Sequence, residues 1–389
     1  MIRHIRIGIP ILGSSHWYAG VSTVEWLVKA IQHLPEEKRP QLFLVITDRT
    51  LKDFSMHQGF ASLFNGIIFQ GGNLKAARTI INFPLTHCVS LDQLFNKIDF
   101  LFPVNSQIWP GRFVVSWIPD FQHRYMPDFI SPQEYALREH RFGEIARQAQ
   151  LIIFTTRTVE KDFLKFYPSS TAITKILSAP FYPEEDWYIS DSRKVQHHYQ
   201  LPDGFILCSN QFWLHKNHAT LFKAIAILRH IGIDVPLVCT GFTEDYRCPD
   251  YFSQLQDYLK TIGITDLVHI LGLIPRSEQI QLIRRSLFVV QPSLFEGLSM
   301  IVQECQAFNK TIILSDLDVH LEQGYGIFFD RMNPEELAQK IADILPYSAP
   351  GPHVLDEAEA KNKTFGKIKL FAEEFCNFAQ EALAIFKQK

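Results

Sequence analysis

Three charged side chains in the second half of the sequence have types and spacings suited to cleaving a bond to a phosphate. Lys216 lies just before a predicted helix that starts at Asn217, and Glu296 and Glu304 are eight positions apart. When a sugar–phosphate bond breaks, negative charge on the leaving phosphate is stabilised by a lysine and by helix N–H groups. One carboxylate can hold sugar hydroxyls or oppose charge at the anomeric carbon, and another can accept hydrogen bonds from a ribose diol. The alternative is structural: Lys216 is then an exposed lysine beside a helix cap, and Glu304 a solvated helix residue.

The stretch Gln291–Glu304, Q-P-S-L-F-E-G-L-S-M-I-V-Q-E, should position both acids. An apolar strand, Leu287 to Val290, runs into a turn with proline and glycine, and a helix is predicted to start near Met300. A strand, a tight turn and a helix N-terminus form an anion-binding corner, because several backbone N–H groups point the same way there. The positions separate the two acids: Glu296 lies in the loop and Glu304 on the helix, so they need not share one role.

Two further places follow predicted strands. Gly241 comes directly after an apolar strand and would let a ligand or another backbone approach closely. Asp120 and His123 flank a turn after the strand Phe113 to Ile118, where histidine can share a proton near neutral pH. The structural alternative has equal weight: Asp120 caps the turn, and His123 packs against Phe121 or Tyr125.

Apolar strands alternate with amphipathic helices along most of the chain, which predicts an α/β fold with parallel sheets. The length of 389 residues favours two domains. We expect an N-terminal domain over residues 1–180, a C-terminal domain over 181–365, and a last helix over 366–389 that crosses back to the first domain. Residues 181–203 are interpreted as a linker with at most a short helix. No helices are assigned between residues 50 and 101.

Composition excludes several function classes. The net charge of −3 gives no bulk electrostatic case for nucleic-acid binding. The six cysteines form no C-x-x-C pair and are interpreted as free thiols in a reducing compartment. Apolar runs fall short of the ~20 residues of a membrane span, so we expect a cytoplasmic protein whose membrane contact, at the inner face, is peripheral. Neither G-x-G-x-x-G nor a P-loop is present.

These motifs together resemble glycosyltransferase family 4, a retaining family with the GT-B fold. Pro292 to Gly297 with Glu304 resembles its P-S-x-x-E-G…E element, and Asn210 to Asn217, N-Q-F-W-L-H-K-N, a variant of its lysine motif. Trp117 to Pro127, W-I-P-D-F-Q-H-R-Y-M-P, resembles a variant of its acceptor-side loop.

The resemblance implies two Rossmann-like domains whose parallel sheets face each other across a cleft, with a nucleoside diphosphate sugar held mainly by the second domain. Such enzymes usually need no metal and no other cofactor. Lys216 matches the phosphate-binding lysine, Glu296 the acid near the transferred sugar, and Glu304 the ribose-binding acid. The remaining donor-site matches are Gly13, Ser14, Asn210, Gly241, Gly297, Leu298 and Ser299, with base contacts expected around Leu273 and Ile274.

Two positions depart from the family pattern. Many relatives have an arginine where this chain has Asn210, which removes one cation from the expected diphosphate site. Many also have His-Asp where this chain has Pro119-Asp120, so Asp120 or His123 is the candidate to replace that histidine.

The function expected from the resemblance is transfer of a sugar to a glycan or lipid-linked acceptor. A GT-B nucleotide-sugar epimerase and a non-catalytic sugar-nucleotide or glycan-binding subunit stay open as alternatives. Product analysis separates the epimerase from the transferase, because an epimerase releases nucleotide without an acceptor.

Overall fold

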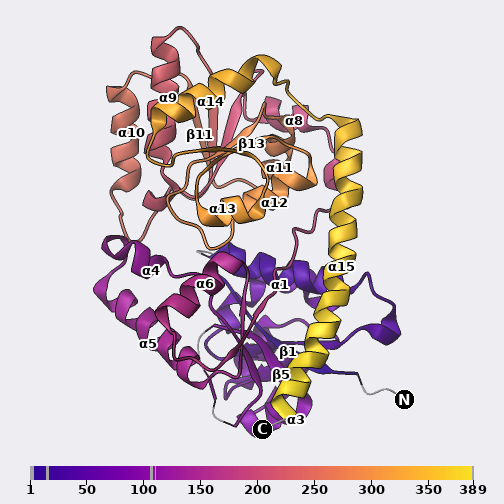
Figure 1. Ribbon diagram of the computed structural model, residues 1–389. Coiled ribbons are helices and arrows are strands. Elements are labelled where there is room, and N and C mark those ends of the chain that lie inside the picture. Colours follow the sequence, from indigo (N-terminus) through magenta and orange to yellow (C-terminus); the bar gives the residue numbers. More distant parts are fainter. Residues whose placement is uncertain (1–3, 15–16, 106–107, 110, 388–389) are drawn as a thin grey trace. The chain divides into compact units, whose positions relative to one another are not determined.

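The computed structural model describes residues 4–14, 17–105, 108–109 and 111–387, which form two compact units (Figure 1). Unit 1 comprises the described residues of Met1–Phe121, Ala136–Tyr182 and Phe365–Lys389. Unit 2 comprises Gln122–Tyr135 and Pro183–Thr364. The segment 122–135 therefore belongs by its contacts to unit 2, although most of the surrounding chain belongs to unit 1.

Unit 1 contains a parallel sheet of eight strands among the described residues, in the order β4-β3-β2-β1-β5-β6-β7-β8. The strands are β1 (Arg6–Pro10), β2 (Gln41–Thr47), β3 (Gly66–Gln70), β4 (Leu85–Cys88), β5 (Phe100–Val104), β6 (Val114–Trp117), β7 (Leu151–Phe154) and β8 (Ile173–Ile176). The chain first builds outward from β1 to β4 and then returns to the other side of β1. That reversal creates a topological switch point, where α/β sheets bind ligands.

Unit 2 repeats this plan with six parallel strands, in the order β11-β10-β9-β12-β13-β14. The strands are β9 (Ile206–Ser209), β10 (Leu237–Thr240), β11 (Val268–Gly272), β12 (Val289–Gln291), β13 (Ile312–Ser315) and β14 (Ile327–Phe329). Its switch point lies between β9 and β12. The parallel α/β architecture predicted from the alternation of elements is confirmed in both units.

Helices connect these strands. In unit 1 they are α1 (Tyr18–Ile31), α2 (Leu74–Ile80), α3 (Leu91–Lys97), α5 (Pro132–Gln148, which starts in unit 2) and α6 (Arg157–Phe166), with 3-10 turns η1 (Glu36–Lys38), η2 (Leu51–Met56) and η3 (Gln58–Leu63). In unit 2 they are α4 (Gln122–Tyr125), α7 (Glu185–Ile189), α8 (Ser192–His198), α9 (His218–His230), α10 (Tyr251–Thr261), α11 (Arg276–Arg285), α12 (Met300–Ala307), α13 (Asp318–Gln323) and α14 (Pro334–Ile344), with η4 (Pro127–Phe129), η5 (Leu214–Lys216) and η6 (Leu345–Tyr347). The last helix, α15 (Val354–Lys387), begins in unit 2 and continues into unit 1 from Phe365.

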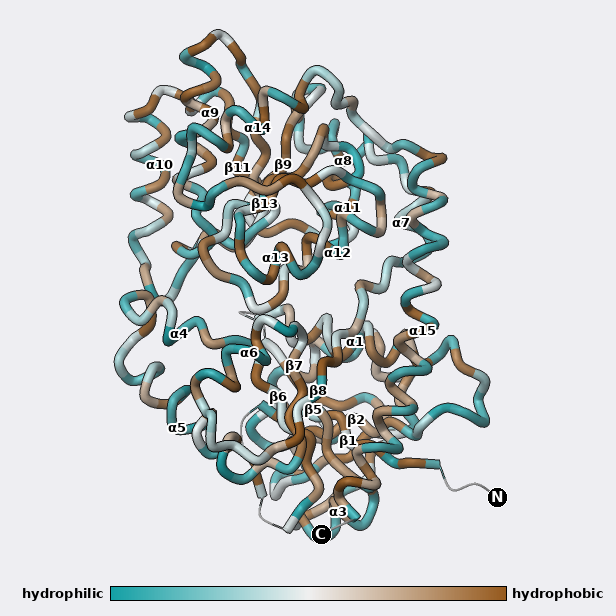
Figure 2. Tube along the Cα trace, viewed as in Figure 1, coloured by the Kyte–Doolittle hydropathy of each residue, from teal (hydrophilic) through white to brown (hydrophobic). Residues whose placement is uncertain are grey.

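Local sequence explains where several helices begin. The Thr156 hydroxyl accepts a hydrogen bond from Val159 N and caps α6. The Asn333 side chain accepts from Glu336 N and caps α14, whose first residue is proline. The Ser131 hydroxyl accepts from Glu134 N at the start of α5. In Figure 2 the hydrophobic colour follows the strands inside each unit, whereas hydrophilic residues dominate outer segments such as α5.

The seam of aromatic residues on α15 packs into the core of unit 1. Phe371, Phe375 and Phe378 are buried there, and Phe102 of β5 contacts the last two rings edge-on, at centroid distances of 5.2 and 5.6 Å. Such edge-to-face contacts stabilise the packing of the helix beyond what its buried apolar area contributes. Among the described residues, no helix is long and apolar enough to cross a membrane.

Two local expectations are corrected. The segment 50–101 contains α2, α3, β4 and two 3-10 turns, where the sequence pattern supports no helix assignment. These elements are short, so their hydrophobic periodicity covers too few residues to be recognised. The stretch 181–203 is also more ordered than a linker with at most one short helix, since it contains both α7 and α8.

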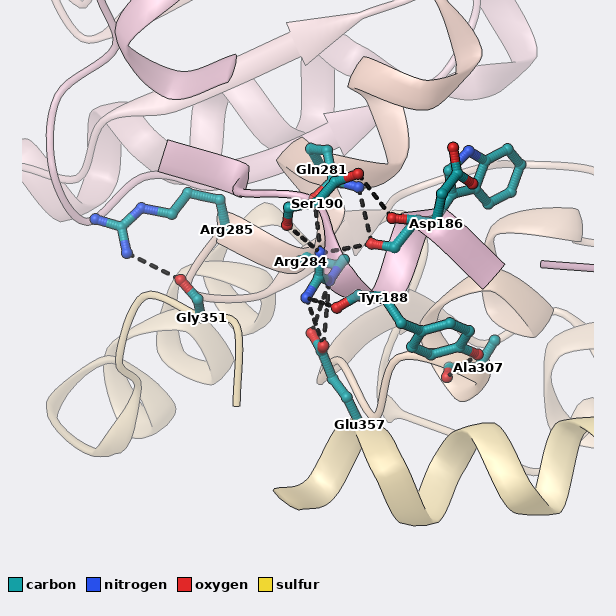
Figure 3. A network of polar contacts seen from close by, with 10 residues as sticks. Asp186, Tyr188, Ser190, Gln281, Arg284, Arg285, Ala307, Gly351 and Glu357 are labelled. Carbon is teal, nitrogen blue, oxygen red and sulfur yellow. Dashed lines mark hydrogen bonds and ion pairs between the residues drawn. The ribbon is translucent and has the colours of Figure 1, made fainter. Parts of the chain in front are cut away.

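Arg284 explains why the stretch 181–203 is ordered. This side chain is 1% exposed, lies at the end of α11, and forms an ion pair with Glu357 of α15 at 2.8 Å (Figure 3). Its guanidinium also donates to the backbone oxygens of Trp187, Tyr188 and Ser190 at 2.6 to 2.8 Å. One buried cation therefore ties α7 and the beginning of α15 to unit 2.

We expect Glu357→Ala to lower the free energy of unfolding of unit 2 by about 3–5 kcal/mol, because it leaves the buried Arg284 charge without its carboxylate. Chemical denaturation checks this. The matched control is Glu359→Ala on the same helix, whose partner Lys363 is 70% exposed; it should leave the transition unchanged. Equal effects of the two substitutions would contradict the assignment of Arg284 as the anchor.

Lys310 gives unit 2 a pH-dependent stability. Its ammonium is buried, donates to the Ser286 carbonyl at 2.7 Å, and has its pKa lowered by burial from 10.5 to about 8. Between these pH values the unfolded chain binds the proton that the folded state has lost, so the free energy of unfolding rises with pH across this window. We expect Lys310→Met to lose this rise. Denaturant titrations of both proteins at pH 7.5 and 10 measure it, and parallel pH dependences would contradict it.

Candidate active site

The switch point of unit 2 brings together side chains that follow β9 and end β12. Asn210, directly after β9, donates from Nδ2 to Oε1 of Gln291, the last residue of β12, at 2.7 Å. Both residues are buried. The strands β9 and β12 are parallel neighbours, and the chain continues from β9 toward one edge of the sheet and from β12 toward the other. Their carboxyl ends therefore open the crevice in which such sheets bind ligands.

A continuous polar network extends from this pair to the candidate catalytic residues. Gln291 donates from Nε2 to Oε1 of Glu296 at 2.9 Å, and Lys216 Nζ contacts the same oxygen at 2.6 Å. The side chains of Lys216 and Glu296 are only 14% and 9% exposed. The lysine charge is therefore paired with the Glu296 carboxylate at the switch point.

The position of Lys216 is set by the turn around it. Lys216 ends η5, and Asn217 follows in the left-handed conformation with φ 57° before α9 begins. The Asn217 amide donates to the carbonyl oxygens of Pro292 and Arg331 at 3.1 and 3.2 Å, and Leu294 N donates to His215 O at 2.7 Å. The lysine turn and the Glu296 loop are thus bonded directly to each other.

Glu304 is buried on α12 and is only partly satisfied. Its Oε1 accepts from Arg276, the first residue of α11, at 2.6 Å, whereas its Oε2 is buried without a hydrogen-bond partner in the described part of the chain. A buried carboxylate oxygen without a donor is costly. It therefore marks a position where a ligand hydroxyl would be stabilising.

Gly241 permits a close approach of two backbones at this edge. It has φ 139°, and a Cβ at this position would overlap the carbonyl group of Asn210. Its N–H donates to Gly272 O at 2.8 Å. The structure thus gives Gly241 a packing role directly beneath Asn210.

The turn between Glu296 and α12 supplies the remaining predicted donor residues of unit 2. Gly297 and Leu298 lead into Ser299, the N-cap residue of α12, whose N–H donates to Gln323 Oε1 at 3.3 Å. Leu273 follows β11 and is 75% exposed, next to the half-buried Ile274.

The predicted residues of the first half are divided between the units. Gly13 and Ser14 lie after β1 in unit 1, where Gly13 has φ 82° and a Cβ there would overlap backbone atoms of Trp17 and Val21. Asp120 also lies in unit 1 and is 3.7 Å from Arg138.

His123 belongs to unit 2. It is fully buried on α4, with its ring 5.4 Å from that of Tyr135 in an edge-to-face contact. His123 thus packs against an aromatic ring, as the structural alternative anticipates, but the ring is that of Tyr135, which the alternative does not name.

Several residues of the site have no role in the sequence analysis. Gln291 joins Asn210 to Glu296, Arg276 holds Glu304, and Gln323 contacts Ser299. A polar residue that ends a fully apolar strand is a recognisable signal for Gln291. Arg276 and Gln323 carry no such signal, because their partners are 28 and 24 positions away.

Arg247 anchors a second polar cluster in unit 2. It forms a buried ion pair with Asp245 at 2.9 Å, lies 4.7 Å from the Trp213 ring centroid, and donates to Gln122 at 3.3 Å. This cluster connects the segment 122–135 to the loop after β10. In the described part of the chain, no three His, Cys, Asp or Glu residues are grouped to hold a metal ion.

Part of the chain matches a known protein family. Residues 191–359 match the family model described as "Glycosyl transferases group 1". This match covers less than half of the chain and falls within unit 2. The network from Asn210 to Glu304 lies entirely inside it, and the match indicates that the protein is a glycosyltransferase.

Solved structures show the fold of the whole glycosyltransferase. Anabaena HepE in complex with UDP-glucose superposes with a TM-score of 0.67 at 16% identity, covering 96% of this chain and 100% of that one. WaaG, described as a glycosyltransferase involved in lipopolysaccharide biosynthesis, gives 0.58 at 12%, covering 96% and 99%. Sucrose-phosphate synthase from Thermosynechococcus elongatus gives 0.59 at 13%, covering 98% and 100%. The predicted GT-B fold class is therefore confirmed. No curated protein matches the chain.

We expect Gly241→Ala in this glycosyltransferase to lower the free energy of unfolding by about 3 kcal/mol or more, because steric overlap with Asn210 adds to backbone strain. The control is Gly263→Ala, which has φ 70° but open space around a built Cβ; it should cost about 1 kcal/mol. Denaturant titration of both variants measures the difference, and equal losses would show that only backbone conformation matters at Gly241.

Proposed function

We propose that the protein is a retaining glycosyltransferase that moves a sugar from a nucleoside diphosphate sugar to a glycan or lipid-linked acceptor, as a family 4 member. The observation that carries the proposal is the Lys216–Glu296 ion pair of 2.6 Å at the switch point of unit 2. A lysine and an acid that are held together there can separate to receive opposite parts of a donor.

Donor binding exchanges the partner of Lys216. The ammonium leaves Glu296 for the diphosphate, where it acts as a point charge beside the N–H groups of the first turn of α12. Glu296 then becomes available to the hydroxyls of the transferred sugar. The Gln291 amide keeps Glu296 oriented during this exchange, because it donates to Oε1 independently of the lysine.

The nucleotide is assigned to α12 and α11. Arg276 ties up one oxygen of Glu304 and leaves Oε2 for the ribose diol. The backbone around Leu273 and Ile274 is the proposed contact for the base. Asn210 supplies no charge to the diphosphate, so Lys216 is the main cation of this proposed site.

The reaction breaks the bond between the anomeric carbon and the diphosphate oxygen and forms a bond to the acceptor hydroxyl oxygen. The proton of that hydroxyl passes to the departing phosphate, which gives a nucleoside diphosphate and a glycoside. Lys216 and the α12 N–H groups lower the barrier by stabilising the charge on the leaving group. Metal ions and other cofactors have no part in this proposal.

Gly13 and Ser14 of unit 1 are proposed as donor contacts, and the acceptor is proposed to bind beside Asp120, with Asp120 or His123 in place of the family histidine. The fold shared with WaaG, a glycosyltransferase involved in lipopolysaccharide biosynthesis, supports a glycan acceptor. The HepE complex with UDP-glucose makes a uridine nucleotide the first donor to test. The proposed enzyme is cytoplasmic, and its membrane contact is peripheral at most.

We expect UDP, GDP or ADP to raise the melting temperature of the wild-type protein, and the corresponding sugar donor to be hydrolysed or transferred. A ligand at 100 times its Kd stabilises the folded state by about 2.7 kcal/mol. Lys216→Met should lower donor turnover about 100-fold or more, because a charge on the leaving group loses its counter-ion. Glu304→Gln should mainly weaken nucleotide binding.

The matched control is Lys223→Met on α9, whose side chain is 51% exposed. It should retain full turnover. Equal turnover of wild type, Lys216→Met and Glu296→Ala would remove the proposed site. Release of free nucleotide with an altered sugar and without acceptor would instead identify an epimerase, and nucleotide binding without any turnover would identify a binding subunit.

A further inference from the structure

Both ends of the Glu296 loop are bonded to the segment that runs from β13 through α13. At one end, Ser315 Oγ donates to Ser293 O at 2.6 Å. At the other end, Gln323 Nε2 donates to Ser299 O at 2.9 Å. Ser315 is the last residue of β13 and Gln323 the last residue of α13, so one contiguous stretch fixes both limits of the loop.

The contact at Ser299 has two points. Gln323 Oε1 also accepts from Ser299 N at 3.3 Å, so a single side-chain amide bonds both the N–H and the C=O of one residue. Two bonds to the same residue restrict rotation of the peptide planes on both of its sides, much as a neighbouring strand would. Gln323 therefore determines the direction in which α12 begins.

The N-terminus of α12 lacks the usual cap. Ser299 occupies the N-cap position, but its side chain accepts no hydrogen bond from the helix, and its Oγ is buried without a partner among the described residues. A serine cap would normally occupy an N–H group of the first turn. Here the orientation of the helix start comes from Gln323. Of the first-turn N–H groups, that of Val302 donates to Ser299 O at 3.3 Å, which leaves those of Met300 and Ile301 to a ligand.

The base of α13 is itself fixed. His320 is fully buried, and its Nδ1 lies 2.8 Å from Ser315 O, to which it donates. Burial lowers the pKa of this imidazole, which favours its neutral form. Gly324, with φ 64°, then ends the helix directly after Gln323. The side chain that contacts Ser299 thus projects from a short, well-anchored element.

We propose that Gln323 is a positioning residue for the donor: it holds Ser299 so that the first turn of α12 faces the diphosphate of the nucleotide sugar. This inference rests on the proposed function and adds a residue that acts without contacting the reacting atoms. Loss of the contact allows the turn to rotate, which weakens binding of the diphosphate. Lys216 and Glu296 keep their own partners, so turnover of the bound donor is largely preserved.

The test uses Gln323→Met, which keeps the length of the side chain but removes both hydrogen bonds. The probe is the nucleoside diphosphate that stabilises the wild-type protein, with UDP first, measured by isothermal titration calorimetry. The expected result is an increase of about 5- to 30-fold in Kd and in donor KM, which corresponds to two lost hydrogen bonds. We expect kcat to stay within about threefold of wild type.

Gln323→Glu tests the positioning role through the pH dependence of nucleotide binding, which a purely structural role would not change. Ionised, it adds a negative charge beside the diphosphate and loses the donor to Ser299 O, so binding should be weaker than for Gln323→Met. Once protonated, the carboxyl regains a donor and an acceptor in the geometry of the amide. The ratio of its Kd to that of wild type, each measured at the same pH, should therefore fall as the pH is lowered from 7 to 5.

The control is Glu322→Gln, on the neighbouring exposed position of α13, which should bind and turn over donor as wild type does. Wild-type Kd values for both Gln323 variants, alongside lost turnover in Lys216→Met, would overturn this inference and leave the proposed function intact. A lower melting temperature with an unchanged Kd would also overturn it. Absence of nucleotide binding and turnover in the wild-type protein would overturn both proposals.

Discussion

The ion pair between Lys216 and Glu296 depends on the order of strands in unit 2. The two residues are 80 positions apart, and they meet because β9 and β12 are adjacent although β10 and β11 lie between them in the sequence. The reversal of strand order at this point opens a crevice at the carboxyl ends of the two parallel strands. Asn210 and Gln291 occupy its base, so the charged pair above them has rigid neutral support.

This ion pair explains how the switch point can hold two charges at low exposure. A buried lysine without a partner would have a large desolvation cost, and so would a buried glutamate. Their pairing offsets both costs. Glu304 is different, because Arg276 satisfies one of its oxygens and the other has no partner in the described part of the chain. Unit 2 therefore combines one acid that is paired with a lysine and one acid that is satisfied at a single oxygen.

The rest of unit 2 keeps these elements in register. Arg284 fixes α7 and the start of α15 through a buried guanidinium, at a distance from the charged pair. Gln323 and Ser315 fix the loop between β12 and α12. In both places a side chain satisfies backbone groups that regular secondary structure leaves unpaired, as buried polar groups require. Loops that position ligands are thereby stabilised without adding further helices or strands.

The sequence alone determined the alternating α/β architecture, since long apolar strands and amphipathic helices have distinct periodicities. It also singled out Lys216, Glu296 and Glu304 as candidate site residues, because each lies next to a recognisable strand end or helix start. It failed for α2, α3, α7 and α8, whose periodicity spans too few residues. Only the tertiary structure placed Gln291, Arg276 and Gln323 against their partners, and only it assigned His123 to unit 2. Local patterns record the propensity of a segment, whereas contacts across many residues depend on strand order and packing, which no short stretch of sequence encodes.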